Sequence, residues 1–153
     1  MQCTILTVDE LEIVKSELAE ILEDPNIEII NAVNEVEALK IIGKKEYTID
    51  MIVWAVNSGN IKSFEDLKRL KSDCLCKDIP VIVVSSFTDK RYVIEAIESG
   101  AVEFIAKPYD KNAVVRKIGR VAGLLNKINN YETTEDIITF SFSEMSSREI
   151  KAA

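Results

Sequence analysis

The stretch IPVIVVSSFTDKRYVIEAIESGAVEFIAKP, residues 79–108, decides the fold. It opens with an apolar run, Val81 to Ser85, that is typical of a strand covered on both faces. A segment with helical periodicity follows from about Lys90 to Ser99, and Gly100 is in place as its C-cap. A second apolar run, Val102 to Ala106, completes a strand-helix-strand unit. Two consecutive strands joined through a helix predict a parallel pair with a right-handed crossover.

The same unit recurs along the chain. Further β-branched apolar runs lie at Ile5 to Val8, Ile27 to Ala32 and Met51 to Val56. The run at Met51 is apolar at nearly every position, as expected of a central strand, whereas Ile27-Glu28-Ile29 alternates as an edge strand does. Strict alternation of strands and helices predicts an α/β fold. We expect a doubly wound, mostly parallel sheet of five strands with helices on both faces.

The segments between the runs are amphipathic helices. The first has a predicted inner face of Leu11, Val14, Leu18, Ile21 and Leu22. The second has one of Val36, Leu39, Ile41 and Ile42. A third helix is expected from about Phe64 to Ser72. The last starts after Asp110 and places an apolar stripe at Val114, Ile118, Val121, Leu125 and Ile128.

Composition narrows the class of protein. The 153 residues, 47% of them hydrophobic, suit one globular domain with a single filled core and a short appendage. A net charge of -7 argues against direct binding to nucleic acid or to an anionic membrane, because both need clustered cations. No stretch approaches the roughly 20 apolar residues of a membrane span, and the start lacks the features of a signal peptide. We therefore expect a cytoplasmic protein.

The cysteines predict no metal or redox site. There are three, two of them as Cys74-x-Cys76, and there is no histidine in the sequence. Four-coordinate zinc needs more nitrogen and sulfur ligands than these. Reduced, incidental thiols are the expected state.

Polar or small residues stand where the strands end. Asp9, Ala55, Ser85 and Lys107 all occupy strand ends, and Glu10 follows Asp9. In open α/β sheets the carboxyl ends of the strands meet at one crevice. The spacing therefore predicts that four segments far apart in sequence form one site. Ala55 closes an apolar run at the point where the surrounding pattern would place a carboxylate.

Four segments together resemble the receiver domain of two-component response regulators. They are ILTVDE at 5–10, YTIDMIVW at 47–54, IPVIVVSS at 79–86 and GAVEFIAKP at 100–108. The resemblance extends from about residue 3 to residue 128, which gives a receiver-like domain over 1–129. It implies a flavodoxin-like fold with strand order 2-1-3-4-5.

The resemblance also implies a role for each site residue. In the family an acidic pair holds magnesium, an aspartate ending the third strand takes the phosphoryl group, and a Ser or Thr and a lysine bind that group. Here Asp9 and Glu10, Ser85 and Lys107 match, but the phosphoacceptor position is Ala55. A methyl group can neither attack phosphorus nor ligate a metal. We expect no enzymatic activity, weak or absent magnesium binding at Asp9 and Glu10, and a Lys107 that turns toward Asp9.

Two more positions depart from the family. The loop Val56-Asn57-Ser58-Gly59-Asn60 lacks the usual Pro and Asp-Gly. The switch position three residues before Lys107 is Phe104, where relatives carry a tyrosine whose hydroxyl reports phosphorylation. Phe104 and Trp54 are expected in the core. The phosphoacceptor position and the switch position therefore both differ from the family pattern.

Each pocket residue also has a plainer interpretation. Asp9 or Glu10 could cap the first helix, because carboxylates favour helix N-termini. Ser85 could bond a neighbouring carbonyl, and Lys107 could be a solvated side chain. The stripe on the last helix most simply packs on the sheet, and its heptad-like continuation could also support pairing with a second copy.

Residues 130–153 do not fit a receiver. They are interpreted as a linker followed by the start of a truncated C-terminal output domain. The stretch 148–152, REIKA, weakly resembles the opening of a diguanylate cyclase domain, but the Gly-Gly-Asp-Glu-Phe signature is missing. The expected partner is another protein or the chain's own output domain. A homodimer through the fourth helix, fifth strand and fifth helix is the second expectation.

The leading hypothesis is a pseudoreceiver, a signal-transduction module that acts by protein contacts and is independent of phosphorylation. One alternative is that the vestigial pocket binds an ion or a small anionic ligand through Ser85 and Lys107. Another is the receiver module of a diguanylate-cyclase-like protein. A flavodoxin-like reductase is disfavoured, because the first strand leads straight into Asp9 and Glu10 and lacks the Ser/Thr/Gly-rich phosphate loop that a flavin needs.

Overall fold

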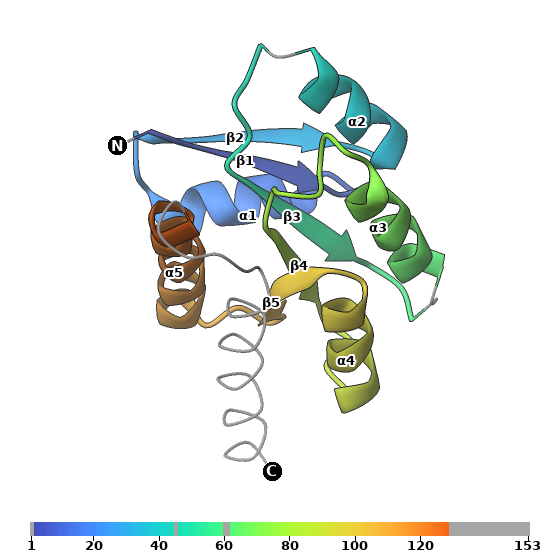
Figure 1. Cartoon of the computed structure of the whole chain (residues 1–153). Coiled ribbons are helices and arrows are strands. Elements are labelled where there is room, and N and C mark those ends of the chain that lie inside the picture. Colours follow the sequence, from blue (N-terminus) through green and yellow to red (C-terminus); the bar gives the residue numbers. More distant parts are fainter. Residues whose placement is uncertain (1, 45, 60–61, 129–153) are drawn as a thin grey trace.

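Five parallel strands and five helices alternate along the part of the chain that the structure describes (Figure 1). The computed structural model describes residues 2–44, 46–59 and 62–128, with side chains as far as 123. The strands are β1 (Cys3–Val8), β2 (Ile27–Ala32), β3 (Met51–Val56), β4 (Val81–Ser85) and β5 (Ala101–Ala106). The helices are α1 (Ile13–Leu22), α2 (Glu35–Gly43), α3 (Lys62–Ser72), α4 (Lys90–Glu98) and α5 (Lys111–Ile128).

The strands form one sheet in the order β2-β1-β3-β4-β5. Every neighbouring pair is parallel. The predicted flavodoxin-like topology with strand order 2-1-3-4-5 is therefore confirmed. β2 lies at an edge and β3 at the centre, as their alternating and continuous apolar patterns predicted.

Alternate residues along the strands fill two hydrophobic layers. One layer contains Ile5, Val53 and Ala55 together with Val14 of α1 and Ile118 of α5. The layer on the opposite face holds Leu6, Ile52, Trp54 and Phe104, and it packs against α2, α3 and α4. Figure 1 shows α1 and α5 together on one side of the sheet. The carboxyl ends of the strands therefore lie between helices of both layers.

Two residues predicted on inner helix faces are exposed instead. Leu11 is 57% exposed, because α1 begins only at Ile13 and Leu11 belongs to the preceding loop. Val36 is also 57% exposed. The face of α2 that meets the sheet is centred on Ala38, and a residue two positions away points about 200° around the helix.

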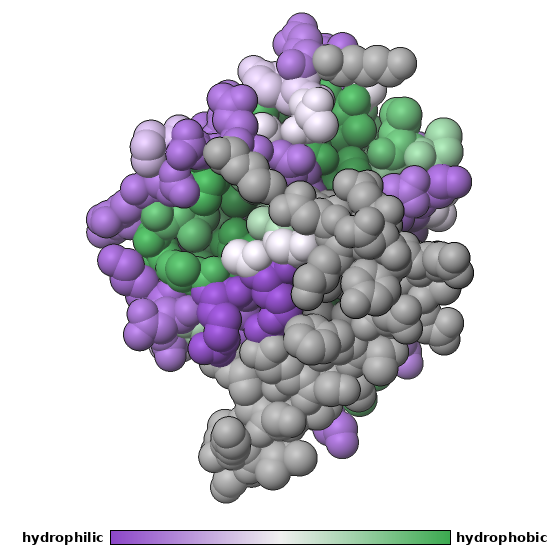
Figure 2. Space-filling model, turned by 60° about the vertical axis from the view of Figure 1, so that its left-hand side comes forward, coloured by the Kyte–Doolittle hydropathy of each residue, from purple (hydrophilic) through white to green (hydrophobic). Residues whose placement is uncertain are grey.

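The apolar stripe on α5 is confirmed as far as its side chains are described. Val114, Ile118 and Val121 are buried against the sheet. The side chains of Leu125 and Ile128 lie outside the described set, and so do residues 130–153 with the predicted linker and output domain. Among the described helices none is long and apolar enough to cross a membrane. On the face shown in Figure 2, hydrophilic residues surround smaller hydrophobic patches.

Candidate functional site

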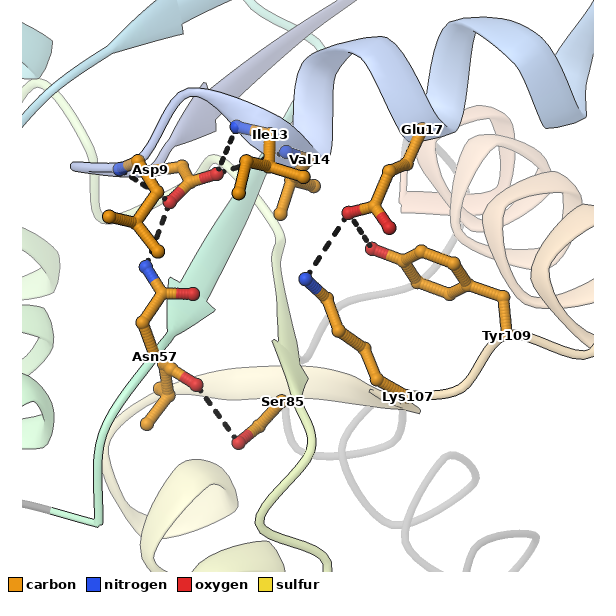
Figure 3. A network of polar contacts seen from close by, with 10 residues as sticks. Asp9, Ile13, Val14, Glu17, Asn57, Ser85, Lys107 and Tyr109 are labelled. Carbon is orange, nitrogen blue, oxygen red and sulfur yellow. Dashed lines mark hydrogen bonds and ion pairs between the residues drawn. The ribbon is translucent and has the colours of Figure 1, made fainter.

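The predicted strand-end residues come together at one edge of the sheet (Figure 3). Asp9 directly follows β1, Ser85 ends β4 and Lys107 directly follows β5. The strand register places Ser85 beside Val56 of β3 on one side and beside Ala106 of β5 on the other. The backbone N–H of Lys107 donates to the Ser85 carbonyl at 2.8 Å, which extends this pairing past the end of β5.

Asp9 is a capping residue in this structure. One carboxylate oxygen accepts from the backbone N–H of Ile13 at 2.8 Å and from that of Val14 at 2.9 Å. The other accepts from the N–H of Leu11 at 3.0 Å and from the Asn57 side-chain amide at 2.8 Å (Figure 3). Asp9 is 2% exposed. The plainer interpretation of Asp9 as the cap of the first helix is confirmed by these contacts.

These hydrogen bonds set the charge state of Asp9. Burial by itself raises the pKa of the carboxyl, but the hydrogen bonds from Val14, Asn57, Leu11 and Ile13 favour the ionised form and lower the pKa overall. The neighbouring Glu10 is exposed. The acidic pair is therefore divided between a buried cap and a surface side chain.

Ala55 lies inside β3, opposite Val84 of β4. It is 9% exposed and belongs to the hydrophobic layer under α1 and α5. Its methyl group provides no oxygen at the position where the family carries its nucleophile. Phe104 and Trp54 are each 4% exposed, so both predicted core aromatic residues are in the core.

The Ser85 hydroxyl is hydrogen-bonded to its own neighbours. Its hydroxyl donates to the Val56 carbonyl at 3.1 Å and accepts from the backbone N–H of Phe87 at 2.9 Å. The side chain is 1% exposed. The plainer interpretation, a bond to a neighbouring carbonyl, is the one observed.

Lys107 pairs with Glu17 of α1, at 3.2 Å between Nζ and Oε1. The Tyr109 hydroxyl donates to the same oxygen at 3.2 Å, and the Lys107 ammonium lies 5.6 Å from the centre of the Tyr109 ring. Burial and the Glu17 carboxylate raise the pKa of Tyr109. The expected turn of Lys107 toward Asp9 is wrong, because Glu17 is within reach and the Asp9 oxygens already face four N–H donors.

The donor set does not fit a magnesium ion as it stands. Magnesium takes oxygen ligands in near-octahedral geometry, and both Asp9 oxygens are aimed at N–H groups. Glu10 is exposed and Ala55 has no ligand atom. Within residues 2–44, 46–59 and 62–128 no three acidic, cysteine or histidine side chains gather closely enough to hold a metal. Occupation would require the Asp9 cap to open.

The residues that complete these contacts were not predicted from the sequence. Asn57, Glu17 and Tyr109 hold the pocket together, yet they lie in a loop, on a helix and after a cis Lys107-Pro108 bond. Glu103 was not predicted as a site residue either. It is fully buried in β5 and forms ion pairs with Lys117 and Arg120 of α5. The available signal was a carboxylate inside an apolar run and two cations three residues apart on the last helix.

Comparison with known proteins agrees with the fold. A family model described as the response regulator receiver domain matches residues 5–119. The rice protein "Two-component response regulator-like PRR37" (Oryza sativa subsp. indica) is 29% identical over 108 residues, which are 71% of this chain. The phosphate regulon transcriptional regulatory protein PhoB of Pseudomonas aeruginosa is 28% identical over 118 residues, which are 77% of this chain.

The solved structures agree as well. A putative response regulator from Chloroflexus aurantiacus superimposes with a TM-score of 0.68 at 25% identity, and the match covers 80% of this chain and 99% of that one. The curated relatives are longer proteins. The aligned part is 15% of the rice protein and 51% of the Pseudomonas protein. The comparison therefore concerns their receiver portion.

Proposed function

The chain belongs to the response regulator receiver family, and we propose that it is a signalling module that works without aspartyl phosphorylation and acts through protein contacts. Ala55 carries the proposal. It stands at the carboxyl end of the central strand, among apolar side chains, where the family's chemistry needs an oxygen nucleophile. A fold of this kind can present surfaces to a partner without any reaction at that position.

The contacts around Ala55 support the same proposal. Ser85 and Lys107, which would bind a phosphoryl group, each have partners inside the chain. Asp9 serves as the cap of α1. An anion bound at Lys107 would have to compete with the Glu17 carboxylate, which already pairs with the lysine. This competition disfavours the alternative of a small anionic ligand.

The test is incubation of the full chain with a small phosphodonor and magnesium, followed by intact-mass measurement and peptide mapping. A receiver that keeps its aspartate, treated in parallel, shows that the donor is active. We expect no added phosphoryl group on this chain. A phosphoryl group mapped to residues 50–60 would refute the proposal.

The output is proposed to pass through a protein surface, either to a covalently attached domain or to a separate partner in the cytoplasm. The face made by α4, β5 and α5 is the proposed contact for a second copy. Analytical ultracentrifugation over a range of concentrations tests this point. A chain that stays monomeric at high concentration leaves the attached or separate partner as the target.

A further inference from the structure

The turn that follows β3 contacts three other parts of the molecule. We call residues 56–59 the β3 turn. Its Asn57 side chain donates a hydrogen bond to Asp9, which precedes α1, at 2.8 Å. Its Val56 carbonyl accepts the Ser85 hydroxyl at the end of β4, at 3.1 Å. Its Gly59 carbonyl accepts the hydroxyl of Tyr92 in α4 at 3.3 Å. One short segment therefore joins α1, β4 and α4 by hydrogen bonds.

The first end of this connection is buried. Asp9 is 2% exposed, and the same carboxylate that accepts from Asn57 also holds the N–H groups that begin α1. The donor of Val14 is buried with it. A shift of the Asn57 amide therefore changes the cap on which the first turn of α1 rests. Figure 3 shows Asn57 pointing up to Asp9 while Ser85 bonds the turn from below.

The other end is packed tightly against α4. Tyr92 is 9% exposed, and its ring lies 5.6 Å from that of Phe87 and 6.5 Å from that of Phe64 between ring centres. The Arg91 guanidinium also donates to the Tyr92 hydroxyl, at 3.2 Å. A Cβ placed on Gly59 would lie 3.1 Å from that hydroxyl oxygen. The turn therefore sits in direct contact with the first turn of α4.

We propose that the β3 turn couples the N-terminal end of α1 to α4, with Asn57 and Tyr92 as the positioning residues. Phe104, at the family's switch position, has no hydroxyl, whereas Tyr92 places one against the turn. The coupling is held by hydrogen bonds and needs no covalent modification. This coupling goes beyond the proposed function, because it does not depend on whether the chain accepts a phosphoryl group.

The coupling has its physical basis in the hydrogen bonds that neighbouring groups of the β3 turn share. Residues in one hydrogen-bond network do not respond independently to substitution. A partner that displaces the exposed loop before α1 pulls on Asp9, and through Asn57 on the turn that Tyr92 contacts. The reverse path runs from α4 to the cap of α1. Such linkage is reciprocal by thermodynamic necessity.

Tyr92→Phe in the full chain is the principal test, read by amide hydrogen exchange. The substitution removes one hydroxyl and keeps the ring in place. We expect the amides of Ile13 and Val14, which bond Asp9, to exchange about threefold to tenfold faster. The amide of Val114, bonded to the Asp110 carbonyl in α5, is the internal reference for global opening. Tyr47→Phe makes the same chemical change at a 39% exposed side chain. It should change the exchange rates of neither the α1 amides nor the Val114 amide.

The double variant separates coupling from two local effects. In an Asn57→Ala background the connection is already cut, so Tyr92→Phe should leave Ile13 and Val14 unchanged. The proposal is overturned if Tyr92→Phe alters exchange only within α4, or if its effect on α1 persists without Asn57. Should Asn57→Ala fail to fold, the single Tyr92→Phe variant with its two references decides the matter alone.

Discussion

Removal of the Asp9 carboxylate should destabilise the fold strongly. The side chain accepts four hydrogen bonds, and the one from Val14 is buried. A buried donor left unmet costs about 1–3 kcal/mol, and loss of a helix cap costs about 1 kcal/mol. Asp9→Ala should therefore lower the free energy of unfolding by about 3 kcal/mol. Urea denaturation followed by circular dichroism measures it.

Glu10→Ala is the matched control, and the sign of the effect decides between two roles. If Asp9 and Glu10 repelled each other as an unfilled metal pair, removal of either charge would stabilise the protein. For a cap beside an exposed glutamate, Asp9→Ala destabilises and Glu10→Ala changes the stability by less than about 0.5 kcal/mol. An Asp9→Ala variant as stable as the unsubstituted chain would refute this account of the pocket.

The pH dependence follows from the lowered pKa of Asp9. A carboxyl whose folded pKa lies below its unfolded value contributes stability above that unfolded value, 3.8, and loses it as the pH falls through the folded pKa. The stability gap between the unsubstituted chain and Asp9→Asn should therefore be constant above about pH 5 and shrink below about pH 4. Denaturation curves collected above about pH 5 and below about pH 4 check the direction.

Three other expectations are open to measurement. Glu103→Ala should lower the free energy of unfolding by about 3–5 kcal/mol, because it removes the carboxylate that pairs with the buried cation of Lys117; urea denaturation measures this. Ala55→Asp should recover weak magnesium binding, and adding Glu17→Gln should weaken it again, because this change removes a carboxylate and releases the Lys107 cation; calorimetric titration measures both. An alkylating reagent should label the exposed Cys74 well before Cys76, whose pKa burial raises to about 11; peptide mapping gives the order.

The sheet was predictable because each strand is marked by its own apolar run and the same pattern recurs along the chain. Three of the strands begin and end at the predicted residues, since an apolar β-branched run bounded by turn residues has few other uses. Helix starts were less predictable. Leu11 fits the spacing of the inner face of α1, but the Asp9 cap and a left-handed Glu12 with φ 59° delay the helix to Ile13. A periodic pattern cannot reveal a cap that lies four residues upstream.

The site was predictable in its positions and not in its contacts. Parallel topology alone brings Asp9, Ser85 and Lys107 to one edge. Which partner each one takes depends on side chains from other elements, such as Glu17, which carries no motif. For Glu103 the sequence offered a carboxylate inside an apolar run, but not the strand register. A register shift between β4 and β5 pairs Ile82 with Glu103, and no sequence pattern marks that irregularity.

The polar groups at the strand ends are bonded to one another and to their neighbours, and Ala55 offers no covalent trigger. The most direct measurement is a pair of ¹⁵N-labelled amide spectra, recorded before and after addition of magnesium with a beryllofluoride phosphoryl mimic. We expect the amide signals of Ser85, Lys107 and the turn after β3 to keep their chemical shifts. Saturable shifts at those amides, spreading into α4, would contradict this expectation.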